Sequence, residues 1–437
     1  MSTPPRDTTH RRAVTATVIG NFIESFDWLG YGLFAPFFAA QFFPSDNFFT
    51  SLLGAFAVLG AGVLMRPLGG ILLGRYADRR GRRPALMLAI SLMAGGSLLI
   101  GLTPTYTHIG LFAPLLLLLA RTAQGVSHGG EWPAATAYLM EVAPRHRKAT
   151  YGSLFSLTTC AGAFAASLLG GGLTAVLDPA AMTAWGWRVP FLLGGVLGLI
   201  LLVLRTRLVE TEVFRREVRT HRHRGSLRHL MRTHRRSVLL AVLYVAGSGA
   251  VGGTWPAVVP ALGGRLAAPG TMFWVVVSVT AVMMALNVPI GLLADRVGAT
   301  RLLLAASALF AVTGSVSYLT MTGTFASLLF TYGSGVAYLV CATTVLPKLL
   351  TEIFPPTIRA LGIGLPNALT SAVLGGIAPA CAAYAAEHNA SAWFITGVMV
   401  AVLLSVPASL LARTASPLPP PTARTPAPER PLTTTGS

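Results

Sequence analysis

Charged residues are scarce in this sequence. Of its 437 residues only 11% are Asp, Glu, Lys or Arg, whereas an ordinary soluble domain carries about 25%. Acidic residues are the scarcer kind, at 15 against 33 Lys and Arg, which gives a formal net charge of +18. The shortage of charge excludes a soluble globular protein, because too few charged side chains are present to cover a water-facing surface.

Cysteine is scarce as well. The three cysteines, Cys160, Cys341 and Cys381, are far apart in apolar segments, so neither a disulfide framework nor a cysteine metal cluster is expected. No nucleophile–base set and no phosphate-binding loop occurs in the sequence either. The sequence therefore does not predict an enzyme, and it predicts no metal and no cofactor.

Long apolar blocks make up most of the chain. Hydrophobic residues account for 53% of it, and blocks such as Ala85–Leu102 and Val189–Leu204 are nearly free of charge. Helices of this length cross a hydrocarbon core of about 30 Å at about 1.5 Å per residue. We expect an all-α membrane protein with twelve transmembrane helices, near 16–41, 52–74, 84–103, 110–141, 149–177, 187–206, 238–262, 271–294, 302–321, 324–350, 360–385 and 391–412.

The basic residues alternate with these segments. If successive helices run in opposite directions, all but four Lys and Arg residues fall on the side of the N-terminus. This asymmetry predicts a multi-pass protein of the cell membrane with both termini in the cytoplasm. A nucleic-acid-binding protein would instead concentrate its positive charge on one domain. The basic, then apolar, start is not a signal peptide, because Glu24 and Asp27 interrupt the apolar stretch.

Composition divides the chain into five parts. Residues 207–237 are rich in Arg and His, and we expect a cytoplasmic loop that contacts anionic lipids. Residues 413–437 are rich in Pro, Thr and Ala, which is typical of a disordered tail. The predicted parts are an N-terminal tail over 1–15, a six-helix bundle over 16–206, the loop, a second bundle over 238–412, and the C-terminal tail.

Two motifs recur about half a chain length apart. Residues 74–83 read G-x-x-x-D-R-x-G-R-R after the second expected helix, and Gly291–Gly298 repeats the pattern in part after the eighth. Likewise, Glu141–Pro144 after the fourth expected helix recurs as Glu352–Pro355 after the tenth. Repetition at equivalent helix ends predicts two parallel six-helix repeats.

Several blocks of the sequence resemble a known family. The motif at 74–83 resembles the signature of the major facilitator superfamily, and other blocks resemble its branch of metabolite–proton symporters, which includes carriers of proline/betaine, α-ketoglutarate, citrate and shikimate. These blocks lie at Gly20–Asp27, Met65–Gly70, Arg121–Glu131, Trp187–Phe191, Glu210–Phe214 and Leu346–Gly362. Agreement is dense over 20–215 and around 346–379, and thin over 238–345.

The resemblance implies the major facilitator fold, with two six-helix bundles joined by a cytoplasmic loop. It also implies a monomeric secondary active transporter that takes up a small carboxylate-bearing or zwitterionic metabolite by alternating access, with the proton as coupling ion. Ser25 departs from the family pattern, which has Trp at that position. The proline-rich tail lacks the coiled coil of the osmosensing proline/betaine carriers, so osmosensing is disfavoured.

Two other functions are possible in this fold. An exporter that exchanges protons for a small natural product would usually carry a Gly-Pro motif in the fifth helix, and the segment Cys160–Gly170 has no proline. A non-transporting membrane sensor would require an added signalling domain, which the sequence does not contain. We therefore favour uptake.

Ionisable groups inside membrane helices are functional candidates, because burying them costs several kcal/mol. Glu24 and Asp27 share one face of the first helix, and Arg121, Gln124 and His128 share one face of the fourth. Asp27 and Arg121 are expected near mid-bilayer, where they could pair. Our hypothesis is that Asp27 or Glu24 takes up a proton, and that the freed Arg121 binds substrate beside Gln124 and His128. The alternative is a static ion pair that stabilises the bundle.

Further candidates have weaker signals. Trp28, Tyr31 and Trp255 could line a substrate cavity or be packing residues. Gly125 and Gly129, four residues apart, predict close helix packing, and Arg66 is expected to be a structural ion-pair partner, with a substrate role as the alternative. Carboxylates and guanidiniums at helix ends make breakable contacts, so we expect a cytoplasmic gate or latch formed by Gly74, Asp78, Arg79, Gly81, Arg82, Glu131, Glu141, Asp295 and Arg296.

Overall fold

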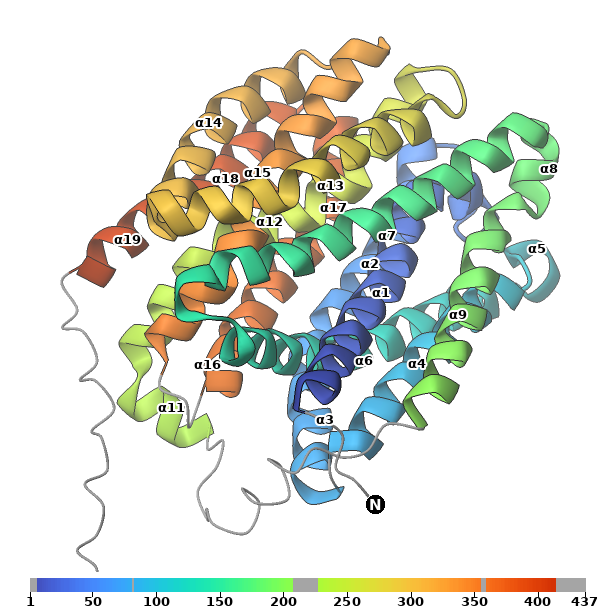
Figure 1. Ribbon diagram of the computed structural model, residues 1–437. Coiled ribbons are helices and arrows are strands. Elements are labelled where there is room, and N and C mark those ends of the chain that lie inside the picture. Colours follow the sequence, from blue (N-terminus) through green and yellow to red (C-terminus); the bar gives the residue numbers. More distant parts are fainter. Residues whose placement is uncertain (1–5, 81, 207–226, 355–358, 414–437) are drawn as a thin grey trace, which may run out of the picture.

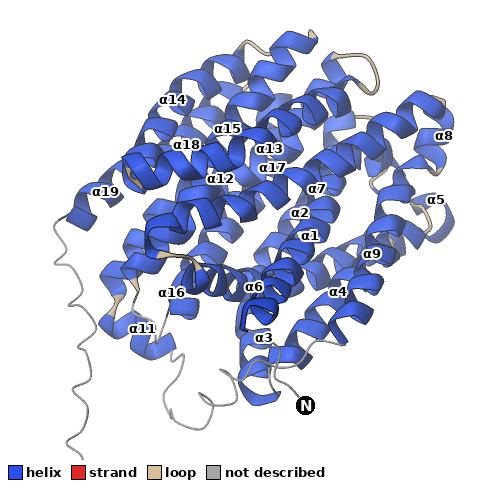
Figure 2. Cartoon of the chain, in the orientation of Figure 1, coloured by secondary structure: helices blue, strands red, loops and turns tan. Residues whose placement is uncertain are grey.

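A computed structural model describes residues 6–80, 82–206, 227–354 and 359–413. Within these ranges the chain is helical, with short connections and no strand (Figures 1 and 2). The N-terminal half consists of α1 (Arg6–Phe42), α2 (Phe48–Leu64), α3 (Arg66–Arg80), α4 (Arg82–Leu102), α5 (Tyr106–Ile109), α6 (Phe112–Val142), α7 (Lys148–Val176), α8 (Pro179–Ala184) and α9 (Val189–Thr206).

The C-terminal half repeats this alternation of long helices and short connections. It consists of α11 (Leu227–Thr233), α12 (Arg235–Leu266), α13 (Thr271–Val297), α14 (Ala299–Leu319), α15 (Phe325–Ile353), α16 (Arg359–Thr370), α17 (Gly376–Glu387), α18 (Ser391–Leu403) and α19 (Ser405–Arg413). A π-helical turn at Ser371–Gly375 joins α16 to α17. We call the end of the molecule that holds the first residues of α1 and α11 the tail side, and the end that holds α5 and α8 the far side (Figure 1).

Each of the twelve expected segments coincides with one described helix or with two helices joined end to end. Among the described residues, nine segments are long and apolar enough to cross a membrane, and Met87–Leu102 is a shorter apolar helix. The all-helical membrane fold is thus confirmed, whereas the number of crossings and the division at 206 and 238 stay predictions. One expectation was wrong: the motif at 74–83 was expected to follow the second helix, but its residues up to Arg80 belong to α3.

A proline explains the break between α2 and α3. Pro67 is the second residue of α3 and has no N–H to donate to the preceding turn. Met65 lies two residues before Pro67. Its N–H approaches two carbonyl oxygens, those of Ala61 at 3.2 Å and Gly62 at 3.3 Å. The break places Arg66 at the start of a new helix.

Glycines let α6 pack backbone to backbone against this break. A Cβ atom on Gly125 would lie 1.8 Å from the carbonyl oxygen of Gly62, and one on Gly129 would lie 1.8 Å from that of Arg66. No side chain fits at such distances, so only glycine permits the crossing. The prediction of close packing at these two glycines is confirmed.

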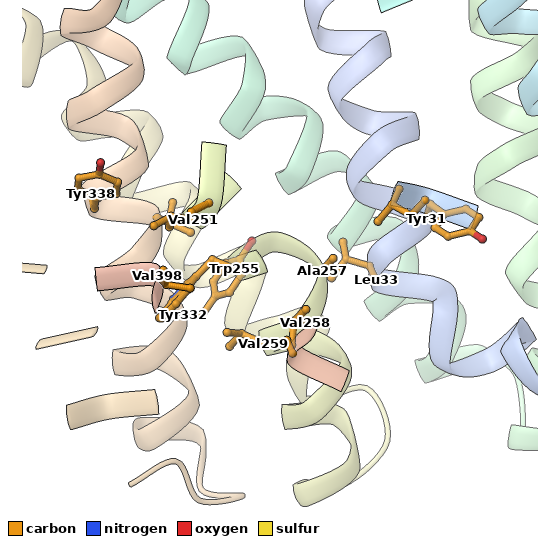
Figure 3. Close-up of a cluster of buried hydrophobic side chains, with 14 of the residues drawn as sticks. Tyr31, Leu33, Val251, Trp255, Ala257, Val258, Val259, Tyr332, Tyr338 and Val398 are labelled. Atoms are coloured by element: carbon orange, nitrogen blue, oxygen red, sulfur yellow. The ribbon is translucent and has the colours of Figure 1, made fainter. Parts of the chain in front are cut away.

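The interior of the C-terminal half is an apolar cluster that includes large aromatic residues. Trp255 on α12 is fully buried, and its ring contacts Phe310 edge to face at a centroid distance of 5.0 Å. Figure 3 shows Trp255 within this cluster, together with Tyr332, Tyr338 and Val398. The interior of this half is thus built by packing, and its described ionisable contacts, such as that of Asp295 with Lys348, lie at its ends.

Candidate functional site

Asp27 on α1 is the centre of a buried polar cluster. Its carboxylate accepts hydrogen bonds from Ser97 Oγ on α4 at 2.5 Å and from Gln124 Nε2 on α6 at 2.8 Å. Arg121 Nη1, also on α6, lies 3.4 Å from Asp27 Oδ2. The side chains of Asp27 and Arg121 are 4% and 0% exposed, so this is an ion pair removed from solvent. Three helices thus converge on one carboxylate.

The Arg121 guanidinium is only partly satisfied. Its central carbon lies 4.0 Å from the ring centroid of Tyr31 and 5.5 Å from that of Trp28, both within the range of cation–π attraction. Within the described part of the chain, its Nε and Nη2 atoms are buried without a hydrogen-bond partner, and the Gln124 Oε1 atom is also unpaired. Because unpaired buried donors are costly, this group is suited to receive an anion.

The two acidic residues of α1 contact different residues of α6. Glu24 Oε1 directly contacts His128 Nδ1, one helical turn from the Asp27 pair. The pairing follows from direction: α1 and α6 run antiparallel in this register, so the earlier residue on α1 meets the later one on α6. The structure therefore brings Asp27, Glu24, Arg121, Gln124 and His128 together, as expected from the sequence.

Trp28 contacts both this cluster and Arg66. The guanidinium carbon of Arg66 is 4.4 Å from the Trp28 ring centroid, and the His128 ring stacks on the indole at 6.4 Å. Within the described ranges, no carboxylate lies within ion-pair distance of Arg66, and its Nε is buried and unpaired. The expectation that Arg66 is a structural ion-pair partner was wrong, because its neighbour is an aromatic face.

Tyr31 and Trp255 use their polar atoms for packing. Tyr31 is fully buried, and its hydroxyl donates to the carbonyl of Ala55 at 3.0 Å, so its ring rather than its hydroxyl faces Arg121. The Trp255 Nε1–H donates to the carbonyl of Thr331 at 2.8 Å, and the ring is enclosed by the C-terminal core. In this structure Trp255 packs within its own half and is apart from the Asp27 cluster.

Asp295 connects the two halves at the tail side. From the end of α13, its carboxylate accepts the backbone N–H groups of Ala149 at 3.0 Å and Thr150 at 2.9 Å, and the Thr150 hydroxyl at 2.8 Å. Lys348 Nζ lies 3.5 Å away. A carboxylate from one half therefore caps the N-terminus of α7 in the other, where the helix dipole favours negative charge. Arg296 is exposed.

The remaining predicted gate residues are not located by the structure. Gly81 lies outside the described residues. For the others, the structure describes only that their backbones belong to α3, α4 or α6; these residues are Gly74, Asp78, Arg79, Arg82, Glu131 and Glu141.

A second contact joins the halves at the far side. Asn47 Nδ2, which precedes α2, donates to Glu387 Oε1 at the end of α17 at 2.8 Å. Arg265 at the end of α12 lies 4.8 Å from the ring of Phe48 and 4.5 Å from the ring of Phe49. These groups line a surface pocket of about 460 Å³. The halves are thus in contact at both ends of the molecule.

Sequence reasoning missed three participants. Ser97 holds Asp27, while Thr150 and Lys348 hold Asp295. A lone serine in an apolar helix is common, so Ser97 gave no signal of its own. Lys348 could have been found, because a lysine inside the expected segment 324–350 is unusual in a membrane helix.

Comparison with known protein families extends these observations. The Major Facilitator Superfamily profile matches residues 17–262. The citrate-proton symporter of Klebsiella pneumoniae is 35% identical over 393 residues, which cover 86% of each chain. The alpha-ketoglutarate permease of Escherichia coli K12 is 34% identical over 406 residues, which cover 91% of this chain and 93% of the permease. A putative proline/betaine transporter of Staphylococcus aureus is 42% identical over 221 residues, half of this chain.

Solved structures show the same fold. The xylose transporter XylE from E. coli, in a partially occluded inward open conformation, superposes with a TM-score of 0.70 over 95% of this chain and 100% of that one. Its sequence identity is 16%, so the similarity concerns the arrangement of helices. The arrangement in two helical halves is therefore that of known membrane transporters.

Proposed function

The chain belongs to the major facilitator superfamily, in the branch of metabolite–proton symporters, and we propose that it takes up a small carboxylate-bearing or zwitterionic metabolite together with protons. The observation that carries the proposal is the buried Asp27–Arg121 pair, in which two guanidinium nitrogens have no hydrogen-bond partner among the described residues. The names of the citrate and alpha-ketoglutarate relatives support a carboxylate substrate.

Coupling follows from the competition for Arg121. While Asp27 is ionised, it is the counter-charge of Arg121, and a substrate carboxylate must displace it. Displacement would leave an uncompensated carboxylate in a low-dielectric interior, which is strongly unfavourable. Protonation of Asp27 removes that charge, so proton and substrate bind most favourably together. Ser97 and Gln124 keep Asp27 in place throughout, because both bond to its carboxylate.

Glu24 and His128 provide a second proton-binding pair one turn closer to the tail side. Their direct contact lets a proton pass from one group to the other without crossing apolar surface. His128 also stacks on the Trp28 ring, which contacts Arg121. Protonation of the Glu24–His128 pair therefore acts on the same indole ring that Arg121 contacts. We assign these residues to proton transfer, and Gln124, Trp28 and Tyr31 to positioning of Arg121 and substrate.

Alternating access requires contacts between the halves that form and break. We propose that Asp295 with the N-terminus of α7 is a latch at the tail side, which stabilises the state closed there. In the membrane, the tail side faces the cytoplasm of the cell, both termini are cytoplasmic, and basic loops contact anionic lipids. The protein acts as a monomer, and the proton is its coupling ion.

Uptake into proteoliposomes with an imposed pH gradient tests this function. The panel contains citrate, 2-oxoglutarate, proline and glycine betaine, each with and without a protonophore. We expect accumulation of a carboxylate-bearing compound toward the alkaline side and its loss with the protonophore. Arg121→Gln should abolish it, whereas the exposed Arg301→Gln, a matched loss of one guanidinium, should not. Movement of the compound against the proton gradient would instead indicate an exporter.

A further inference from the structure

Arg66 is a half-buried cation whose charge no carboxylate in the described structure compensates. Its Nε atom is buried without a partner, and no carboxylate of the described residues lies within ion-pair distance. Its contact is the face of Trp28, at 4.4 Å from the guanidinium carbon to the ring centroid. A cation–π contact offsets only part of the cost of removing a guanidinium from water. The unused donors are therefore available to an anion.

The position of Arg66 is fixed by the backbone around it. It is the first residue of α3, at the break that Pro67 imposes. Its carbonyl oxygen lies so close to Gly129 on α6 that a Cβ there would be 1.8 Å away. The break and the glycine crossing together hold the Arg66 backbone against the helix that carries Arg121. The guanidinium is thus placed by the fold and is not a freely moving surface group.

Two guanidiniums lie against the same indole. Arg66 is 4.4 Å and Arg121 is 5.5 Å from the centroid of Trp28, so the guanidinium carbons cannot be farther apart than the sum of these distances. Both groups have buried nitrogen donors without partners. Like charges at this separation repel each other in a low dielectric. An anion that binds both would remove the repulsion and satisfy both sets of donors.

We propose that Arg66 is a second anion-binding group and that the transported substrate carries two carboxylates, one bound by Arg121 and one by Arg66, with the Trp28 ring between them. This inference rests on the proposed function and narrows its substrate class. The charges agree with it: once Asp27 and Glu24 are protonated, the two guanidiniums remain, and a dianion neutralises both. A zwitterion would place its own cation beside two others.

A matched pair of ligands tests the second site. 2-Oxoglutarate and its 5-methyl ester share an open carbon skeleton, and the ester replaces one carboxylate with an uncharged group. Binding of each to the purified full-length protein is measured by calorimetry, for the unaltered chain and for Arg66→Gln, Arg66→Lys, Arg121→Gln and Arg301→Gln. Thermal unfolding of each variant shows whether it is folded.

We expect the unaltered protein to prefer 2-oxoglutarate over its 5-methyl ester by about ten- to hundredfold. Arg66→Gln should abolish the preference and leave binding of the ester unchanged. Arg66→Lys should restore part of the preference, because an ammonium supplies charge without the planar guanidinium geometry. Arg121→Gln should weaken both ligands. The exposed Arg301→Gln should change neither.

Several results would overturn the inference. An unaltered protein that does not distinguish the two ligands, or a folded Arg66→Gln variant that weakens both by the same factor, would assign Arg66 to packing. Accumulation of proline or glycine betaine alone in the uptake panel would overturn the two-carboxylate substrate and leave proton-coupled uptake standing. Accumulation of no compound in that panel would overturn both.

Discussion

In the N-terminal half, buried polar side chains contact one another across helices, whereas in the C-terminal half they mostly bond to their own helix. Asp27 joins α1 to α4 and α6 through charged and polar partners. By contrast, the buried hydroxyls of Thr254 and Thr280 donate to carbonyls four residues earlier in the same helix. The first arrangement ties the positions of several helices to a protonation state, and the second leaves helix packing independent of it.

Under the proposed function, this difference gives separate roles to two halves that share one architecture. A proton on Asp27 would change the contacts of three helices at once, so we propose that conformational coupling belongs to the N-terminal half. The C-terminal half meets it through short-range contacts, such as the Asp295 carboxylate on the N-terminus of α7. In this proposal, the C-terminal half is the surface against which the N-terminal half moves. Four experiments can break or sharpen this division.

The largest effect is expected for Asp27→Asn. The amide keeps the size and part of the hydrogen bonding of the carboxylate, and it cannot exchange a proton or pair with Arg121. We expect proton-driven accumulation to be lost completely, while exchange of substrate across the membrane at equal pH persists. Uptake and counterflow in proteoliposomes measure the two separately.

Thr280→Val is the matched control in the other half, because it also removes one buried polar group and Thr280 bonds only within its own helix. It should leave accumulation unchanged within twofold. If Asp27→Asn retained proton-dependent accumulation, the Asp27–Arg121 pair would be a static ion pair. The assignment of coupling to the N-terminal half would then be wrong.

The second effect concerns packing, which both halves build with glycines. Gly125→Ala would place a methyl group 1.8 Å from the Gly62 carbonyl oxygen, which forces α6 away from α2. Overpacking of this kind costs about 3 kcal/mol of stability, and it also moves Arg121 and Arg66. We expect a lower unfolding temperature together with weaker substrate binding.

Two further glycine variants show whether the effects of Gly125→Ala come from this helix crossing in particular. Gly95→Ala meets nothing within 4 Å and should not destabilise the protein. Gly253→Ala, in the C-terminal half, would lie 2.2 Å from the Gly375 carbonyl oxygen. It should lower the unfolding temperature and leave the proton dependence of transport intact. If Gly125→Ala and Gly253→Ala reduced the proton dependence of transport equally, coupling would be spread over the two halves.

Residue spacing along single helices predicted which side chains of the site share a helix face. The spacing of Arg121, Gln124 and His128 on one helix face, and of Glu24 and Asp27 on another, follows from helical geometry alone. Gly125 and Gly129 likewise predicted a close crossing, since small residues four apart make a flat helix face. Because the family fixes which helices are neighbours, the pairing of Asp27 with Arg121 could also be expected from the sequence.

Contacts that depend on tertiary register could not be predicted. Ser97 is one of several serines in apolar helices, and only the packing of α4 on α1 selects it as the partner of Asp27. Arg66 was expected to have a carboxylate partner, because the sequence does not show that the break before Pro67 turns it toward Trp28. Trp255 was a candidate for the cavity, and the pairing of its indole with the Thr331 carbonyl is visible only in three dimensions.

A smaller effect is expected for the contact that the C-terminal half makes with α7. Asp295→Asn keeps one acceptor for the N–H groups of Ala149 and Thr150 and removes the charge that favours the helix N-terminus. The loss is about 1 kcal/mol, which shifts the population toward the state open at the tail side by roughly fivefold. A cysteine at Ser153, which is buried in this structure, reports the shift through its rate of alkylation.

The alkylation is measured in a background in which Cys160, Cys341 and Cys381 are replaced by alanine. We expect faster labelling of Ser153→Cys when Asp295→Asn is added. The exposed Arg296→Gln leaves the contact with α7 untouched and should not change the rate. Unchanged labelling in Asp295→Asn would mean that Asp295 caps α7 without controlling access.

The smallest effect is expected for Trp255→Phe, which asks whether the C-terminal core takes part in the chemistry at all. Phenylalanine retains the aromatic contact with Phe310 and loses the hydrogen bond to the Thr331 carbonyl, at a cost of about 1 kcal/mol of stability. Because the Trp255 ring is enclosed by its own half, uptake and its substrate preference should stay within twofold of the unaltered protein. A tenfold change in affinity without a loss of stability would place Trp255 at the substrate after all, exposed in another conformation, and specificity would then belong to both halves.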